Sequence, residues 1–359
     1  MITKELMDQA IAQSPMKEVR NRFHTSKLAR GHYSPDYRLE ASGVPEVQHA
    51  IDVHCHADSL QQDPLAMAKR ASKNGMGGIV YKTIGGKGSS TQSVQEVREA
   101  LHRWCDEKGI TPSRVWSAYG VGRGWSGISR KLVEENLDEG CAAIWMPVVT
   151  HAYSVYMQSH VQPMTWEEAM SKGYYLLDQH GQLLPEVRDI LHLVADRNVP
   201  LSMGHCQQAE RVAIAEEVEK IGFKKCFIDH PFSDYIGATM DQMKQFAASG
   251  IYLNFIWDEL SPTLGIDPME MFQAVKEIGA DHVLFSSDAQ GGVLYPEHLE
   301  CIRLMRAYAE AFGLTRDEIY QASALNPAKL LGCEGELPAA PLPRTPIERV
   351  AGSQGGNET

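Results

Sequence analysis

Residues 51–56 read Ile-Asp-Val-His-Cys-His, an apolar start that leads into two histidines. Successive side chains of a strand point to opposite faces, so His54 and His56 share one face while Cys55 lies on the other. Two imidazoles placed in this way can bind one metal ion. A single His-x-His pattern is a weak signal, and its interpretation depends on the rest of the chain.

From residue 51 onward, short apolar runs alternate with longer helical patterns, which is typical of parallel β/α units. The predicted strands are Ile51–His56, Gly78–Lys82, Arg114–Tyr119, Ala142–Val148, Val199–His205, Lys225–His230, Ile251–Phe255 and His282–Asp288. The predicted helices include Pro64–Lys73, Ser93–Glu107, Glu186–Arg197, Gln208–Ile221, Thr239–Ala248, Pro268–Ile278 and Pro296–Phe312. Strands that are each followed by a helix favour an α/β fold of the (β/α)8 TIM-barrel type over an open doubly wound sheet.

The chain divides into three parts. Residues 1–49 form an N-terminal arm with one helical stretch, residues 50–335 form the barrel, and residues 336–359 form a Pro/Gly-rich tail that we expect to be flexible. A long connection from Thr150 to about Leu184 is expected to be functional because such loops are uncommon in compact domains. The glycine-rich stretch 85–90 lacks the spacing of a phosphate-binding loop, and we interpret it as a flexible loop.

The composition excludes several classes of function. Apolar residues make up 43% and charged residues 22% of the 359 residues, as in a globular protein with a large core. The net charge of −12 disfavours nucleic acid and anionic membranes as partners, and no apolar run is long enough to span a bilayer. The seven scattered cysteines contain no Cys-x-x-Cys pair, which favours a reducing cytoplasm.

Three further polar residues end later predicted strands: His205, His230 and Asp288. An apolar strand that delivers a polar side chain at its end pays a desolvation cost unless that side chain finds a partner. The carboxyl ends of barrel strands meet at one rim, where active sites form, so these residues should converge with His54 and His56. Imidazoles and a carboxylate suit Zn²⁺, with Mn²⁺, Fe²⁺ or Co²⁺ as alternatives. The competing interpretation is that each residue is satisfied separately at its strand end.

These residues resemble the amidohydrolase superfamily, which has His-x-His after the first strand, histidines after the fifth and sixth, and Asp after the eighth. Residues 326–332, Asn-Pro-Ala-Lys-Leu-Leu-Gly, are similar to a segment that often closes such barrels, and residues 183–230 look closest to an uncharacterised amidohydrolase-like family. The resemblance spans about Ile51 to Gly332. It implies a metal-dependent hydrolase, although the superfamily also contains decarboxylases and isomerases.

The chain departs from the binuclear members of that superfamily. They bridge two metals with a carboxylated Lys or a Glu at the end of the fourth strand, whereas residues 143–148 here read Ala-Ile-Trp-Met-Pro-Val. By resemblance, this favours one metal on His54, His56, His205 and Asp288, with His230 beside it or on it. Lys82 ends the second strand, and three roles stay open for it: bridging ligand, partner for a substrate anion, or structural residue.

We therefore expect a hydrolase that uses a metal-activated water on an amide, lactone or related carbonyl bond. Asp288 and His230 are the candidate catalytic residues, and Lys82, Arg123 and Trp257 are the candidate substrate-binding residues, suited to a small substrate that carries a carboxylate. A metal-dependent decarboxylase or carbon–carbon lyase is the main alternative, and a non-catalytic metal-binding barrel is a further one. We expect no nucleic-acid or membrane partner, while a homo-oligomer stays open.

Overall fold

The computed structural model describes residues 47–57, 63–84, 87–88, 91–157, 164–261, 264–289 and 297–339. Almost all of the predicted N-terminal arm, most of the predicted tail and part of the glycine-rich loop 85–90 lie outside these residues. Among the described helices, none has the length and apolar composition that crossing a bilayer requires.

Eight parallel strands form a nearly closed barrel, as the sequence predicts. Their order around the barrel follows the chain, and a short strand, β3 (Lys87–Gly88), pairs antiparallel with β2. The eight are β1 (Ile51–Ala57), β2 (Gly78–Ile84), β4 (Arg114–Gly120), β5 (Ala143–Trp145), β6 (Leu201–Ser202), β7 (Cys226–Asp229), β8 (Tyr252–Ile256) and β9 (Val283–Ser286).

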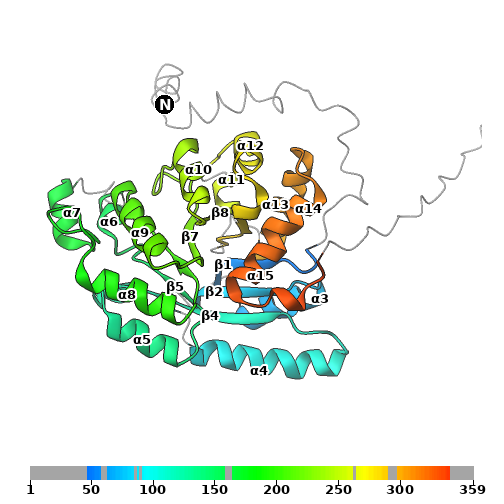
Figure 1. Cartoon of the computed structure of the whole chain (residues 1–359). Coiled ribbons are helices and arrows are strands. Elements are labelled where there is room, and N and C mark those ends of the chain that lie inside the picture. The colour runs from blue at the N-terminus through cyan, green and yellow to red at the C-terminus, as the bar shows by residue number, and fades with distance from the viewer. Residues whose placement is uncertain are drawn as a thin grey trace, which may run out of the picture.

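Helices surround the strands, and their colours in Figure 1 follow the chain from blue to red. The larger outer helices are α3 (Pro64–Lys73), α4 (Thr91–Lys108), α5 (Arg130–Asp138), α8 (Pro185–Asp196), α9 (Gln208–Lys220), α10 (Met240–Ala248), α12 (Pro268–Ile278) and α13 (His298–Ala311). Two of them begin with an Asp-Pro pair, in which the Asp63 or Asp267 carboxylate accepts a backbone N–H of the first turn. Proline suits the first helical position because its missing N–H would have no partner there.

The helices α11 (Trp257–Leu260) and α14 (Arg316–Tyr320) are shorter additions. The predicted long connection contains two short helices, α6 (Ala152–Met157) and α7 (Trp166–Lys172), which lie against each other. A structured connection of this kind can hold side chains in place at the rim of the barrel.

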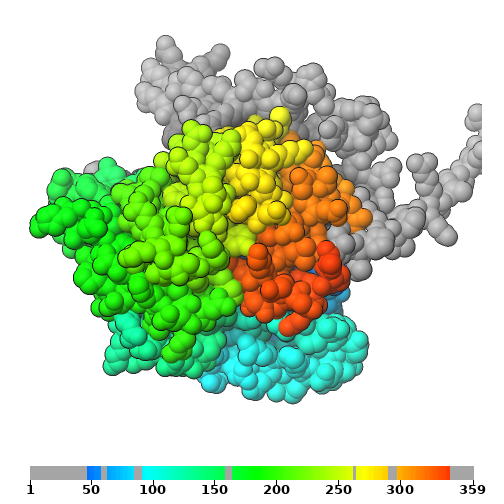
Figure 2. Space-filling model, in the orientation of Figure 1, coloured from blue at the N-terminus to red at the C-terminus, as the bar shows by residue number. Residues whose placement is uncertain are grey.

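One end of the barrel is closed by the last helix, α15 (Asn326–Leu331). Its Ala328 and Leu330 join the apolar cluster inside the barrel, which includes residues from the amino-terminal parts of several strands: Ile51, Val53, Val80, Ala143, Phe227 and Leu284. In Figure 2, the orange-red atoms of α15 lie on the near side of the molecule, to the right of its centre. The functional end must therefore be the opposite, carboxyl-terminal one.

The first and last strands meet where the candidate residues lie. The backbone N–H of Asp288 donates to the carbonyl of His54 at 2.9 Å. Below this contact, the buried Asp52 carboxylate accepts from the backbone N–H of Ser287 at 3.1 Å and from its hydroxyl at 2.5 Å. The closure of the barrel thus sets the position of Asp288 relative to the His-x-His strand.

Candidate metal centre

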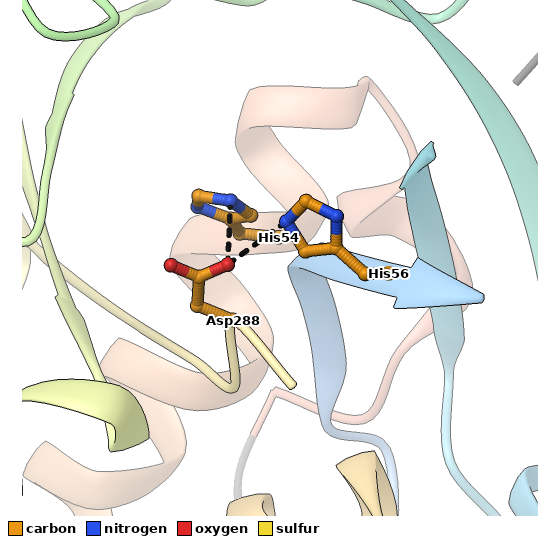
Figure 3. Close-up of side chains that lie close together, drawn as sticks. All are labelled: His54, His56 and Asp288. Atoms are coloured by element: carbon orange, nitrogen blue, oxygen red, sulfur yellow. Dashed lines mark ion pairs between the residues drawn. The ribbon is translucent and has the colours of Figure 1, made fainter. Parts of the chain in front are cut away.

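Three side chains converge at the carboxyl end of the barrel, as Figure 3 shows. Oδ1 of Asp288 lies 3.1 Å from Nε2 of His54 and 2.9 Å from Nε2 of His56. The ligand atoms of the three residues all lie within 4.8 Å of one another. Two imidazole nitrogens and a carboxylate oxygen therefore face a common point.

The atoms of this group suit a divalent cation. Oδ1 of Asp288 is buried, and within the described part of the chain no donor reaches it with hydrogen-bond geometry, despite the two short contacts. A buried carboxylate oxygen in that position is costly unless a cation or a proton compensates it. Nitrogen and oxygen ligands of this kind suit Zn²⁺ and related first-row metals.

The other ring nitrogen of His54 is held by Asp229, which sequence reasoning did not single out. Nδ1 of His54 lies 3.0 Å from Oδ1 of Asp229. The same carboxylate accepts from Trp145 (2.7 Å), Ser202 (2.6 Å) and Asn254 (2.7 Å), and it is almost wholly buried. A carboxylate at Nδ1 places the ring proton there and leaves Nε2 with a lone pair for a metal.

The three other predicted site histidines are held in the same way, each by a hydroxyl oxygen at Nδ1. The pairs are His56 with Thr83 (2.6 Å), His205 with Ser154 (2.7 Å) and His230 with Ser233 (2.8 Å). Because Nδ1 has a hydroxyl partner in every case, Nε2 is the ring nitrogen through which each histidine would bind a metal.

The four imidazoles lie in a continuous row. The ring centroids of His54 and His56 are 5.5 Å apart, those of His54 and His230 are 6.2 Å apart, and those of His205 and His230 are 4.9 Å apart. The structure thus brings His205 and His230 beside the triad of His54, His56 and Asp288. Ligation by either one stays a prediction, because neither belongs to the close group of ligand atoms found among the described residues.

Two of these residues have a left-handed backbone that side chains other than glycine rarely adopt. The φ angle is 35° at His230 and 46° at Asp288. Such a conformation costs about 1–3 kcal/mol and persists only where the surroundings enforce it. Here the N–H of His230 donates to the carbonyl of Asn254 at 2.9 Å, in parallel with the bond from Asp288 to His54.

Lys82 lies beside the triad. Its Nζ is 2.8 Å from Nε2 of His54, so one of the two must accept a hydrogen bond and they cannot both be protonated. Burial lowers the pKa of Lys82. Burial also lowers the pKa of His54, but Asp288 and Asp229 outweigh it and raise the value to about 9.

Burial keeps the remaining imidazoles neutral. It lowers the pKa of His56 and His205, and it lowers that of His230 to about 4. Burial raises the pKa of Asp288, but His54 and His56 outweigh that effect and hold it well below its usual range. His56 and Asp288 thus have the protonation states that a metal ligand requires, whereas His54, with its raised pKa, would release a proton when a metal binds.

A cavity of about 770 Å³ opens beside the triad. It is within the size range of small-molecule sites. Its lining includes His56 of the triad and two of the predicted substrate-binding residues, Lys82 and Arg123. Among its described lining residues there is no Asp or Glu, so the cavity is cationic in a chain whose net charge is −12.

The model of DUF6282, a family of unknown function, matches residues 49–254, which is more than half of the chain. The chain belongs to this family. No curated protein sequence matches it.

Solved structures share the fold at low sequence identity. Dipeptidase AC, a metallopeptidase of family M19, is 12% identical with a TM-score of 0.53, covering 80% of this chain and 99% of that one. An Xaa-Pro dipeptidase with bound methionine is 15% identical with a TM-score of 0.50, covering 80% and 76%. An amidohydrolase from Pseudomonas aeruginosa is 10% identical with a TM-score of 0.49, covering 79% and 95%. The likeness to the two dipeptidases shows that this chain shares their fold.

In this DUF6282 member, Trp257, one of the predicted substrate-binding residues, is not among the described residues that line the cavity. It lies in α11 with 6% of its surface exposed, and its ring stacks on Tyr308 of α13 at a centroid distance of 5.7 Å. A tryptophan that directly follows a barrel strand can turn outward onto the surrounding helices, and sequence position alone does not reveal the direction.

A second group of potential ligands lies nearby: His151, Cys206 and Glu210. All three side chains are fully buried. Nε2 of His151 lies 2.9–3.0 Å from both oxygens of Glu210. Sequence analysis did not relate these residues, because they come from different elements and His151 ends no strand.

Proposed function

We propose that this chain is a metal-dependent hydrolase that adds water to an amide, lactone or related carbonyl bond of a small, carboxylate-bearing substrate. The observation that carries the proposal is the triad: two imidazole Nε2 atoms and a buried carboxylate oxygen converge at the open end of the barrel. A cavity of substrate size begins at one of these ligands, His56. This arrangement brings a carbonyl group within reach of the site.

Three residues would hold the metal directly: His54, His56 and Asp288, with His205 proposed as a further ligand. Zn²⁺ is the best fit to this set, with Mn²⁺, Fe²⁺ and Co²⁺ as alternatives. The bound metal would supply an acidified water and polarise the scissile carbonyl. The hydrogen bond from His54 to Asp229 would fix the ring that faces the metal.

Asp288 and His230 would carry out the proton chemistry. The Asp288 carboxyl has a low pKa, and the backbone of Asp288 is fixed by the bond from its N–H to the carbonyl of His54. The carboxylate could therefore take a proton from water and pass it to the leaving group. His230 is neutral near pH 7, and Nδ1 is engaged by Ser233, which leaves Nε2 to orient water or the substrate oxygen.

Lys82 and Arg123 would bind the anionic part of the substrate. Both line the cavity, and Nη1 of Arg123 donates to the backbone carbonyl of Lys82 at 3.4 Å, so the two cationic side chains arise close together. A carboxylate between an ammonium and a guanidinium gains charge-assisted hydrogen bonds. We favour the substrate role of Lys82 over the bridging role, because Lys82 lines the cavity together with Arg123.

A second candidate function is a metal-dependent decarboxylase or carbon–carbon lyase. The observation that favours it is the same contact of Lys82 with a metal ligand, since it would place a substrate carboxylate directly beside the metal. Turnover in ¹⁸O-labelled water separates the two reactions. Hydrolysis incorporates the label into the product, whereas simple decarboxylation does not.

The experiment for the leading proposal combines metal analysis with a substrate panel. Wild type, Asp288→Asn and the control His102→Asn, an exposed helix position, are purified in parallel. We expect about one metal ion per chain in wild type and the control. We also expect turnover of a carbonyl substrate that the Asp288 variant loses. A metal that stabilises the fold while no member of the panel is turned over would instead favour the non-catalytic barrel.

We also propose a reducing, cytoplasmic location. All seven cysteines are buried free thiols, as in proteins that do not meet an oxidising compartment. A homo-oligomer is a further proposal, which size-exclusion chromatography with light scattering would test.

A further inference from the structure

The loop that follows β4 carries an unusual tryptophan at the mouth of the cavity. Trp125 has 55% of its surface exposed although it lines the cavity, and its φ angle of 60° is left-handed. Glycines at 122 and 124 adopt the same region, with φ angles of 72° and 61°. A bulky side chain in this conformation is strained, so something must hold it there.

Tyr174, from the long connection after β5, holds this loop. Its hydroxyl accepts the backbone N–H of Gly127 at 2.9 Å, and its ring lies 5.9 Å from that of Trp125. A Cβ at Gly122 would lie 2.6 Å from the Tyr174 ring, so only glycine permits this approach. Tyr174 is itself anchored, because its N–H donates to the carbonyl of Thr150 at 2.8 Å.

We propose that Trp125, positioned by Tyr174, is an aromatic platform that binds a planar apolar end of the substrate. This proposal rests on the hydrolase proposed above and adds which molecules its cavity selects: small anions with a planar apolar group. The anionic end would lie toward Lys82 and Arg123, and the planar end would stack on Trp125 at the mouth.

The distribution of charge and exposure over the cavity supports this orientation. Lys82 lies deep, in contact with His54, while Trp125 and Val149 (57% exposed) form an apolar rim. An exposed indole gains most by stacking on another flat apolar surface, which removes both from water. No Asp or Glu is among the described lining residues, so a carboxylate would meet no like charge from that lining.

The test measures binding to the metal-loaded protein, without turnover, by isothermal titration calorimetry. The probes are acetate, hexanoate and phenylacetate, which share the carboxylate and differ in the apolar end. We expect wild type to bind phenylacetate about tenfold more tightly than acetate, and more tightly than the flexible hexanoate. Trp125→Ala should bring phenylacetate close to acetate and leave acetate binding unchanged, whereas Trp125→Phe should keep most of the preference.

Two further variants distinguish a loss of the aromatic platform from a general loss of stability. Tyr174→Phe removes only the hydroxyl that accepts the Gly127 N–H, and it should reduce the phenylacetate preference part of the way while metal content stays unchanged. Trp104→Phe is the matched control, because Trp104 lies on α4 under Lys69 and Lys73 and does not line the cavity. A merely structural role for Tyr174 would lower stability without changing the preference between probes.

Three results would overturn the proposal: equal binding of the three probes by wild type, an unchanged preference in Trp125→Ala, or no binding of any probe up to about 10 mM. The failure of the hydrolase proposal has a different signature. It would appear as absent metal or absent turnover, and the probe preference could persist in that case.

Discussion

The molecule contains two buried groups of histidine and carboxylate that look alike in composition, and they differ in which atoms are already occupied. In the group of His151, Cys206 and Glu210, the carboxylate also accepts the backbone N–H of Leu176 and of Gln207, each at 2.7 Å. Nδ1 of His151 accepts the N–H of Tyr153 at 3.2 Å, so Nε2 carries the ring proton and donates it to Glu210.

In the triad the pattern is reversed. The outward nitrogen of each ring faces an oxygen, Asp229 for His54 and Thr83 for His56, and the inward Nε2 atoms face the carboxylate of Asp288. In the first group, His151 and Glu210 are therefore joined in a hydrogen-bond network that links the connection after β5 to α9. In the second group, Oδ1 of Asp288 has no hydrogen-bond donor among the described residues. The tautomer, set by the outer partner, distinguishes a structural histidine from a metal ligand.

The largest effect is expected when the triad of His54, His56 and Asp288 loses its carboxylate. Asp288→Asn should lower turnover by about 100-fold to 10,000-fold, because the proton acceptor is gone. Metal affinity should also fall, since the anionic ligand becomes a neutral amide. Steady-state kinetics and calorimetric metal titration measure the two effects. Wild-type turnover by this variant would remove Asp288 from the mechanism.

Loss of Asp229, the partner of Nδ1 of His54, should have the next largest effect, and the effect should be on metal affinity. In Asp229→Asn, an amide would meet the N–H groups of His54 and Trp145 with only one oxygen, so His54 would lose its fixed tautomer. We expect metal to bind about 10-fold to 100-fold more weakly. Competition with a chromophoric chelator gives the dissociation constant. An unchanged constant would mean that Asp229 supports only the barrel interior.

In the group of His151, Cys206 and Glu210, loss of the carboxylate should lower the stability of the fold and leave the metal content unchanged. Glu210→Ala leaves the buried His151 and two backbone N–H groups without their acceptor, which should cost about 2–5 kcal/mol of unfolding free energy. Metal content should stay at the wild-type level. Urea denaturation and elemental analysis of the same preparation test both statements. Metal loss with unchanged stability would reverse the assignment of the two groups.

The smallest effect is expected at Thr83. Thr83→Val keeps the shape of the side chain but removes the hydroxyl 2.6 Å from Nδ1 of His56. A hydroxyl orients an imidazole less strongly than a carboxylate does, so metal affinity should fall by less than about tenfold. If the loss exceeded that of Asp229→Asn in the same chelator assay, the ranking of outer partners would be wrong.

The sequence was sufficient for the barrel and for the residues of the triad. Strand patterns located all eight parallel strands to within a few residues, and α3 and α12 begin and end where predicted. The rule that strand ends converge then related His54 and His56 to Asp288 across more than 230 positions. These features depend on local periodicity and on a general property of barrels.

The remaining features depend on tertiary contacts that periodicity does not encode. Asp229 directly precedes His230 and faces the barrel interior, so only the position of His54 opposite it reveals its role. One signal was present in the sequence: a charged residue inside an apolar strand requires a partner. Trp125 is held by Tyr174 from a distant connection, and Trp257 turns to the outer helices, and neither direction follows from sequence order.

The central claim is that one divalent cation lies between His54, His56 and Asp288, and anomalous diffraction from zinc-loaded crystals tests it most directly. The account predicts an anomalous peak about 2.0–2.2 Å from Nε2 of both histidines and from an oxygen of Asp288. A peak between His151 and Glu210, with none at the triad, would contradict it.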